Sequence, residues 1–246
     1  MITGFSRWIK HIFFAEKSLI TYQPELIQAI STEVERRNRY QLDPSTPLRE
    51  IPFIVFDTET TGFYPYAGDQ LISIGAVRVC NGKIYTEQTF HEWINPYRDV
   101  PEECSTVTGV TAADLQAAPP ALIVIYQFLK FTGPHYLVAH CADFDMNFIN
   151  TQLKKYCKQK IKHSIIDTLT LAYHLHPTAK SHKLDFLLER YHIPIINRHH
   201  ALGDALMTAQ LLVHLLAELE RELGVTTLLG LDHLLKSMHI LQSPSL

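Results

Sequence analysis

The chain has 246 residues, of which 46% are hydrophobic and 19% charged; this suits one large domain with a buried core and excludes collagen, coiled coil and general disorder. Lys and Arg number 22 and Asp and Glu number 25, which gives a formal net charge of −3. Because a protein that binds nucleic acid by bulk charge is usually basic, any phosphate chemistry here would need local basic groups or metal ions.

The cysteines do not form a zinc-binding or disulfide-rich pattern, because no two of them are arranged as C-x-x-C. The four are Cys80, Cys104, Cys141 and Cys157. Their spacing argues against a structural zinc site and a small disulfide scaffold, so a reducing cytoplasm is the expected location. No apolar run approaches the roughly 18 residues of a membrane-spanning helix, so we expect a soluble protein without membrane contact.

Residues 1–49 differ in pattern from the rest of the chain. A helix is predicted over residues 24–40, where apolar residues recur at helical spacing, namely Leu26, Ile27, Ile30 and Val34. Two prolines within residues 42–47 oppose a continued helix. We therefore expect an N-terminal helical extension and linker over 1–49, a main domain over 50–223, and a tail over 224–246 of unassigned structure.

The main domain opens with Phe53-Ile-Val-Phe56, a continuous apolar run typical of a strand buried on both faces. Asn81-Gly82 is a strong hairpin signal between two strand-like runs. Strands are expected over residues 53–56, 71–79, 83–94, 136–140 and 164–167. Helices are expected within 101–115, over 120–131, after the fourth strand through 160, after the fifth strand, and over 183–191 and 201–223. Three strands followed by alternating helices and strands indicate an α/β fold with a mixed sheet flanked by helices.

Asp57 and Glu59 are the first residues that suggest chemistry. They directly follow the apolar strand, and side chains two positions apart on a strand point the same way. Adjacent carboxylates repel each other unless a cation lies between them, and Mg²⁺ or Mn²⁺ suits oxygen-only ligands. A solvated strand end, with Asp57 capping the turn, explains these two residues equally well.

Two further segments place acids where a helix is expected to begin. In His140-Cys-Ala-Asp-Phe-Asp145 a buried strand ends and a helix starts, so Asp143 or Asp145 could simply cap that helix. In His199-His-Ala-Leu-Gly-Asp204 the histidine lies on the incoming loop and the carboxylate on the first turns of the last long helix. One histidine among 14 is usually a surface imidazole. All three segments nevertheless lie at strand ends or helix starts, where an α/β fold gathers its active site.

In order along the chain, Asp57, Glu59, Asp145, His199 and Asp204 form the pattern D-x-E … D … H-x-x-x-x-D. This pattern resembles the DEDDh, or DnaQ-like, family of 3′→5′ exonucleases, whose fold is ribonuclease H-like with a five-stranded mixed sheet. The resemblance covers about residues 50–220 and extends to the text around the motifs: FIVFDTETTG, LVAHCADFDMNFI, IIDTLTLA and RHHALGDALMTAQLL. The histidine five positions before Asp204 favours the histidine subclass over the tyrosine subclass.

The resemblance implies metal-dependent hydrolysis of phosphodiester bonds from the 3′ end of nucleic acid, with release of 5′-mononucleotides. Asp57, Glu59, Asp145 and Asp204 would hold two Mg²⁺ or Mn²⁺ ions about 3.5–4 Å apart, and neutral His199 would act as general base. Two such ions would supply the positive charge that lets a protein of net charge −3 act on a polyanion. Single-stranded or frayed DNA is the expected substrate, in proofreading or repair, and a DNA polymerase is a candidate partner.

Two more residues are implied as substrate contacts. The backbone at Thr60 corresponds to a family contact with the terminal nucleotide, and Phe63 to an apolar or aromatic side chain against the last base. The structural alternative for Phe63 is a core residue that closes the turn at Gly62. The sequence departs from the family at Cys141, where asparagine is usual, but this change removes no metal ligand.

A run of lysines follows the second motif, namely Lys154, Lys155, Lys158, Lys160 and Lys162. The run is either a track for the nucleic-acid backbone or a solvated helix face, and we favour the solvated face. Asp167 corresponds to a family position that supports the fold and does not bind metal.

Two other functions remain open at this stage. An exoribonuclease that trims RNA 3′ ends is one, because no residue in the motifs is known to read the 2′-hydroxyl. A non-catalytic nucleic-acid-binding module on the same fold is the other. The complete set of five residues argues against the second alternative, because an idle site would not need four acids whose mutual repulsion costs stability.

Overall fold

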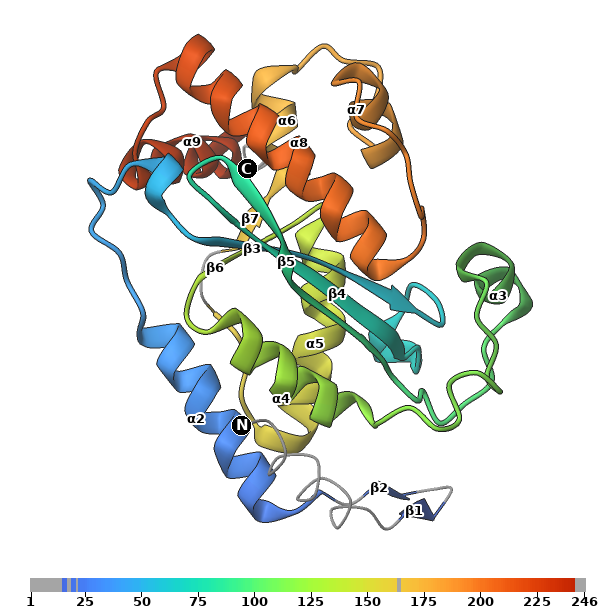
Figure 1. Cartoon of the computed structure of the whole chain (residues 1–246). Coiled ribbons are helices and arrows are strands. Elements are labelled where there is room, and N and C mark those ends of the chain that lie inside the picture. Colours follow the sequence, from blue (N-terminus) through green and yellow to red (C-terminus); the bar gives the residue numbers. More distant parts are fainter. Residues whose placement is uncertain (1–14, 17–18, 21, 163–164, 242–246) are drawn as a thin grey trace.

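The computed structural model describes residues 15–16, 19–20, 22–162 and 165–241 (Figure 1). Ser164, where the last strand was expected to begin, lies outside the described residues. A short antiparallel pair, β1 (Ala15–Glu16) and β2 (Leu19–Ile20), precedes the first long helix, α2 (Pro24–Arg39). The predicted helix over 24–40 is therefore present, one residue shorter.

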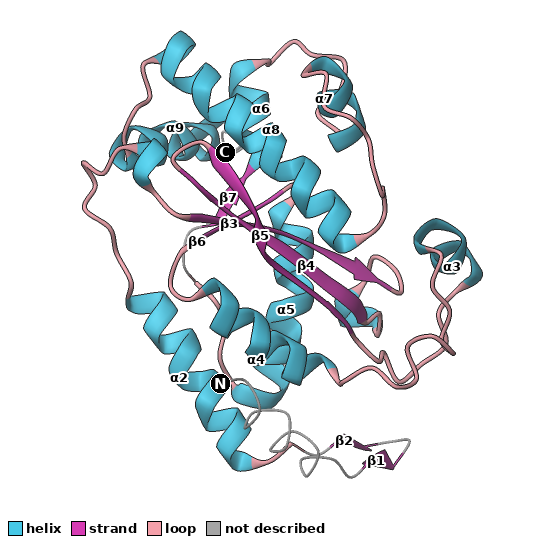
Figure 2. Ribbon diagram, viewed as in Figure 1, coloured by secondary structure: helices cyan, strands magenta, loops and turns pink. Residues whose placement is uncertain are grey.

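The five-stranded sheet has the strand order β5-β4-β3-β6-β7 (Figure 2). Its strands are β3 (Phe53–Thr60), β4 (Leu71–Cys80), β5 (Lys83–Trp93), β6 (Tyr136–Ala139) and β7 (Ile165–Asp167). β3, β4 and β5 pair antiparallel, and the hairpin turn at Asn81-Gly82 joins β4 to β5, whereas β6 and β7 run parallel to β3. The expected α/β fold with a mixed sheet is confirmed.

Helices cover both faces of this sheet. The helices after α2 are α3 (Glu102–Thr108), α4 (Ala121–Thr132), α5 (Ala142–Cys157), α6 (Thr168–Leu175), α7 (Leu184–Arg190), α8 (Ala201–Leu223) and α9 (Leu228–Leu241). In Figure 1, α2, α4 and α5 lie below the sheet and α6 to α9 above it. Strand β3 serves both layers, because Ile54 and Phe56 point into the lower core while Phe53 and Val55 point into the upper one.

Helix α2 is packed into the lower core. Leu26, Ile30 and Val34 are almost completely buried with residues of the sheet and of α4. Arg37 is only 1% exposed, and its guanidinium donates hydrogen bonds to the carbonyl oxygens of His135 (2.7 Å) and Gly133 and to Thr132 Oγ1 (2.5 Å). One buried cation therefore joins the helix to the turn between α4 and β6.

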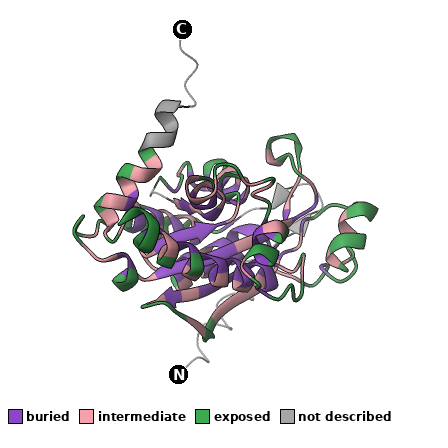
Figure 3. Ribbon diagram, turned by 90° about the horizontal axis from the view of Figure 1, so that it is seen from above, coloured by how far each residue is buried: buried purple, intermediate pink, exposed green. Residues whose placement is uncertain are grey.

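The segment after α8 has a defined structure. Leu48 donates a backbone hydrogen bond to Thr226 (2.8 Å), Pro47 forms a bridge with Thr227, and Leu231 of α9 is buried in the upper core. Figure 3 shows buried segments along the sheet and exposed ones on the outer helix surfaces. The residues that frame the domain in sequence thus pack on each other beside the sheet.

Two elements differ from the expectation. Strand β3 continues through Thr60, four residues beyond the apolar run, so Asp57 and Glu59 lie within a strand and do not follow one. Helix α8 is long and apolar enough for a membrane span, which the sequence was not expected to contain. Because 56% of its most apolar window is buried inside the protein, α8 has the burial of a core helix.

Candidate active site

Strand β3 holds Asp57 and Glu59 on its upper face. The alternation that points Phe53 and Val55 toward α8 continues along the strand, so both acids face the same helix. The register with β4 shifts between Glu59 and Thr60, an irregularity of the kind that often re-aims side chains beside active sites. Strand geometry alone thus brings two carboxylates together.

Gly75 allows the start of α8 to approach these acids. It pairs with Asp57 in the sheet, and a Cβ at this position would lie 2.2 Å from the backbone nitrogen of Leu202 and 2.3 Å from the carbonyl carbon of Ala201. No side chain fits in that space, so the first turn of α8 rests directly on the sheet. Asp204, on that turn, is brought to the two acids of β3.

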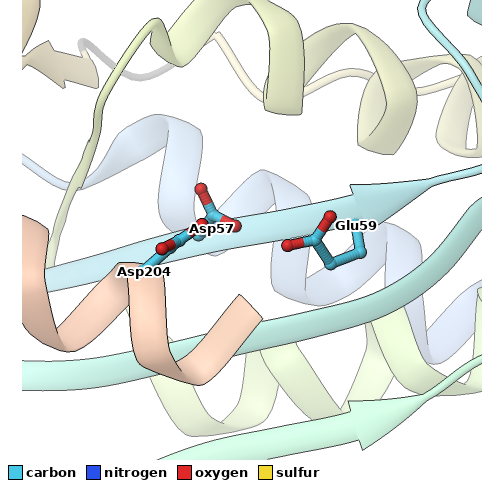
Figure 4. Close-up of side chains that lie close together, drawn as sticks. All are labelled: Asp57, Glu59 and Asp204. Atoms are coloured by element: carbon cyan, nitrogen blue, oxygen red, sulfur yellow. The ribbon is translucent and has the colours of Figure 1, made fainter. Parts of the chain in front are cut away.

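The carboxylates of Asp57, Glu59 and Asp204 converge on one point. One oxygen from each lies within 4.8 Å of the others, although Asp204 is far from the other two in sequence. Figure 4 shows the two acids of β3 and Asp204 of α8 directed into the same space. The side chain of Asp204 is buried, and its Oδ1 has no hydrogen-bond partner within the described part of the chain.

Asp145 lies at the edge of β3 that is opposite β4. The parallel pairing of β3 with β6 ends at Val55, which frees the next part of the strand edge. Asp145, on the first turn of α5, accepts hydrogen bonds there from Thr58 N (2.9 Å) and Thr58 Oγ1 (2.7 Å) through a single oxygen, Oδ1. This acid is 2% exposed. It borders the other three acids but is not part of the group whose oxygens lie within 4.8 Å.

Burial raises the pKa of all four acids, and repulsion between carboxylates adds to this effect for Asp57 and Glu59. Burial, followed by repulsion from Asp145 and Glu59, holds the pKa of Asp57 well above its ordinary value. Burial and repulsion from Asp204 and Asp145 raise the pKa of Glu59 to about 8. Burial raises the pKa of Asp145 to about 7 despite the opposing hydrogen bonds from Thr58. Such mutual repulsion is relieved when a cation binds.

Arg198 partly neutralises the acids. Its Nη1 lies 2.5 Å from Asp204 Oδ2, and its Nε lies 2.5 Å from Asp185 Oδ1 on α7. The same Asp204 oxygen accepts the backbone N–H of His199 at 3.2 Å. One oxygen of Asp204 is therefore used by protein donors, and the other is left for a ligand.

The two adjacent histidines have different surroundings. His199 is exposed, and its backbone is in the left-handed region with φ of 61°. His200 stacks on His91, with ring centroids 4.4 Å apart, and caps α8 by accepting a hydrogen bond from Gly203 N (3.4 Å). Of the two, His199 is the more exposed, and His200 has a structural role at the start of α8.

The expected substrate contacts lie just beyond Glu59. Thr60 is 9% exposed, and its Oγ1 donates to the carbonyl of Gly62 at 2.6 Å. Phe63 is 77% exposed, so the alternative that it is a core residue is wrong. Its ring lies 6.1 Å from that of Phe144, on the first turn of α5. The exposed ring is free to contact a ligand beside the acids.

Asp167 accepts backbone hydrogen bonds from Cys141 (3.0 Å), Ala142 (3.3 Å) and Leu169 (2.9 Å), which joins the starts of α5 and α6. This is the structural role that was expected for it. Cys141 itself has φ of 64°, a conformation that asparagine adopts more readily than cysteine. The departure at Cys141 therefore affects the backbone at the start of α5.

The five lysines after the second motif are all exposed. Lys154 and Lys155 lie on the last turn of α5, at the opposite end of a 16-residue helix from Asp145. Nine residues separate Asp145 from Lys154, which is a rise of about 14 Å along the helix. The run therefore lies more than two helical turns away from Asp145.

The residues present fit a hard divalent cation. The donors are carboxylate oxygens, one of them buried without a partner, and burial raises the pKa of each of the four acids. The sequence motifs did not predict that Arg198, Thr58 and Gly75 contribute to this site. Of these only Gly75 carried a signal, because a glycine inside a strand often marks a close backbone approach.

Comparison with known proteins places the chain in a family of exonucleases. A model of an exonuclease family matches residues 54–212. The chain is 38% identical over 184 residues to a DNA polymerase III subunit epsilon-like protein from Rhodobacter capsulatus. That alignment covers 74% of this chain but only 26% of the relative. The chain thus spans about a quarter of that relative's length.

Two solved structures share the fold. The nuclease domain of 3′hExo, a DEDDh family member bound to rAMP, has a TM-score of 0.61 at 18% identity; the match covers 70% of this chain and 95% of that one. Exonuclease X in complex with 5′ overhanging duplex DNA has a TM-score of 0.57 at 23% identity; the match covers 74% of this chain and 99% of that one.

Proposed function

The chain belongs to the DEDDh, or DnaQ-like, exonuclease family with a ribonuclease H-like fold, and from this premise we propose that it removes nucleotides one at a time from the 3′ end of DNA. The proposed substrate is a single-stranded or frayed end, and the proposed products are 5′-mononucleotides. The observation that carries the proposal is the convergence of Asp57, Glu59 and Asp204 within 4.8 Å. Exonucleases of this family require divalent metal ions.

We assign the metal-binding role to Asp57, Glu59, Asp145 and Asp204. When bound, two Mg²⁺ or Mn²⁺ ions would lower the pKa of a water molecule and stabilise the departing 3′-oxygen. The protein contributes a rigid set of oxygens, because β3, α5 and α8 each fix the backbone of an acid. Thr58 orients Asp145, while Arg198 leaves Oδ1 of Asp204 available.

His199 is the proposed general base. His199 is exposed, and the hydrogen bond from its backbone N–H to Asp204 keeps the residue beside the acids. Neutral imidazole, whose ordinary pKa is about 6.5, can accept a proton from water near neutral pH. The proton would pass from the attacking water to a ring nitrogen of His199 as the phosphorus–oxygen bond to the 3′-oxygen breaks.

The terminal nucleotide is proposed to lie against Thr60 and Phe63. The exposed Phe63 ring next to the acids is suited to stacking on a base of any sequence. The similarity to an epsilon-like protein supports association with a DNA polymerase and a role in proofreading or repair. The rAMP bound to a structural neighbour supports RNA 3′ ends as the second candidate substrate.

The test is digestion of one DNA strand and its RNA counterpart, each labelled at the 5′ or the 3′ end, with Mg²⁺, Mn²⁺ or EDTA. We expect the 3′ label to be released at once as a mononucleotide and the 5′-labelled DNA to shorten in single steps. EDTA should abolish both signals. Loss of the 5′ label first would contradict the proposed direction, and faster digestion of RNA would favour the exoribonuclease.

Asp57→Asn should lower the rate at least about a thousandfold, which corresponds to about 4 kcal/mol of transition-state stabilisation. The matched control is Asp143→Asn, because Asp143 is an exposed acid two residues from Asp145. Equal activity of Asp57→Asn and the wild-type protein would support the non-catalytic binding module instead.

A further inference from the structure

Three large aromatic side chains are exposed within four residues of the loop after β3. Phe63 is 77% exposed, Tyr64 is 69% and Tyr66 is 70%. Isolated exposed rings are ordinary, but a group of them beside a reactive site marks a binding surface. The proposed function uses Phe63 and leaves the two tyrosines without a role.

The loop that presents these rings has a fixed backbone. Residues 65–67 form the short helix η2 (Pro65–Ala67). Asp69 accepts a hydrogen bond from Tyr64 N (3.0 Å) and pairs with Arg98 (3.0 Å). A Cβ at Gly62 would lie 2.3 Å from Asp69, so the loop folds tightly on that carboxylate. The exposure of the rings is therefore a property of an ordered loop, and little conformational freedom is lost when a ligand binds them.

The loop that carries the rings adjoins the elements that hold the acids. It begins directly after Thr60, and η2 packs against α5, the helix that carries Asp145. Tyr66 Oη donates a hydrogen bond to Asn147 Oδ1 (3.3 Å), an exposed residue of α5. Phe63, in the same loop, lies near Phe144 on the first turn of α5. The loop with the exposed rings is thus joined to the helix that carries Asp145 and follows the strand that carries Asp57 and Glu59.

We infer that Tyr64 and Tyr66 form a stacking platform for the nucleobases next to the terminal nucleotide. The inference rests on the proposed function and adds a binding subsite to it. The occupant is the substrate strand itself, because the loop that carries the platform directly follows the strand of Asp57 and Glu59 and packs on the helix of Asp145, the acids that would hold the strand's end. Any base offers a flat face for stacking, so the platform binds without sequence preference. It requires unstacked bases, so it favours single strands over paired ends.

The test separates the platform from the chemistry by substrate length. Thymidine 5′-(4-nitrophenyl phosphate) offers one nucleotide, whereas (dT)₄ also offers neighbouring bases. Tyr64→Ala and Tyr66→Ala should each raise KM for (dT)₄ about tenfold, with kcat unchanged, and should leave hydrolysis of the ester unchanged. Tyr64→Phe and Tyr66→Phe should behave as the wild-type protein, because stacking needs the ring and not the hydroxyl.

The matched control is Tyr85→Ala. Tyr85 is a partly exposed tyrosine near the hairpin turn, at the opposite end of β4 and β5 from the loop. It should change neither KM. Unchanged KM for (dT)₄ in both alanine variants would overturn the platform, and the rings would then be a surface for another partner.

Binding provides the readout if no hydrolysis is observed. Fluorescence anisotropy of labelled (dT)₄ with Ca²⁺ in place of Mg²⁺ measures affinity without turnover. About tenfold weaker binding of each alanine variant supports the platform even if the proposed exonuclease activity fails. Equal affinity of the alanine variants and the wild-type protein overturns the platform even if the activity is present.

Discussion

The two carboxylate oxygens of Asp204 have different surroundings. Oδ2 receives Arg198 and the backbone N–H of His199, whereas Oδ1 is buried with no partner among the described residues. Arg198 also pairs with Asp185, so its guanidinium is held between two acids. The arginine counters part of the negative charge of the pocket and fixes which oxygen of Asp204 faces a cation.

Replacement of Arg198 by methionine should destabilise the protein in EDTA by about 1–3 kcal/mol, because buried Asp204 loses its charged partner. Added Mn²⁺ should restore most of this loss, since a cation then takes the place of the guanidinium. Thermal unfolding in EDTA and in Mn²⁺ measures both effects. Asp185→Asn is the control, because it removes only the outer ion pair. If Arg198→Met is as stable as the wild-type protein in EDTA, the arginine is not needed to offset the negative charge of the acids.

The acids could be predicted from the sequence, but the residues that orient them and partly neutralise their charge could not. Asp57 and Glu59 are recognisable because strand alternation places them on one face whatever the rest of the fold does. Arg198 and Thr58 carry no such signal, because their roles depend on where α7 and α5 end up in space. The metal and catalytic roles assigned to the five motif residues stay predictions until they are tested.

Helix α2 lies outside the residues that the family resemblance covers. Its apolar side chains lie in the lower core, and Arg37 is buried with hydrogen bonds to the turn between α4 and β6. Burial lowers the pKa of Arg37 to about 10, so it stays charged at neutral pH. The helix is therefore held both by apolar burial and by a charged anchor.

Arg37→Met should lower the free energy of unfolding by about 2–4 kcal/mol, because the carbonyl groups of Gly133 and His135 lose charged donors. The matched control is Arg36→Met. Arg36 is half exposed and pairs with Glu33 on the same helix, so its loss should cost less than about 1 kcal/mol. Urea unfolding of both variants is the measurement. Equal stability of the two variants would mean that α2 is held by its apolar face alone.

Most elements could be predicted because their signals are local. The Asn81-Gly82 turn and the apolar stripe of α8 place the hairpin and the last long helix within one or two residues. The extension of β3 through Thr60 could not be predicted from the sequence, because residues 57–60 are polar and are held in the strand by pairing with β4. The helix α9 was missed because its burial depends on contacts with the linker before β3.

On the scale of the whole molecule, the buried acids make the stability of the folded protein depend on pH. A carboxyl whose pKa is higher in the folded state contributes stability that is complete below its unfolded pKa. That stability is lost as the pH rises through the folded pKa. For Glu59 the window runs from 4.5 to about 8, and for Asp145 from 3.8 to about 7.

In EDTA, these two acids should therefore lower the stability of the protein as the pH rises from about 4 to about 8. Buried histidines with lowered pKa, such as His140, act in the opposite direction, so the comparison is with Glu59→Gln. Relative to this variant, the wild-type Tm should decline with pH, and Mn²⁺ should remove the decline. Parallel Tm curves in EDTA would contradict the raised pKa of Glu59.

The division of the chain into an extension over 1–49, an exonuclease domain over 50–223 and a tail over 224–246 stays a prediction. The described parts of all three segments contribute buried residues to the two cores, namely through Ile30 of α2, Val55 of β3 and Leu231 of α9. Sequence pattern separates the segments because the family motifs end near residue 220, whereas packing joins them.

The central claim is that acids from β3, α5 and α8 form one cation site. Its most direct test is the anomalous diffraction of Mn²⁺ in crystals of the wild-type protein. The account predicts a manganese peak about 2–2.3 Å from carboxylate oxygens of Asp57 and Asp204, with Glu59 and Asp145 at the same pocket. A pocket without manganese at saturating concentration, or acids turned away from a peak bound elsewhere, would contradict it.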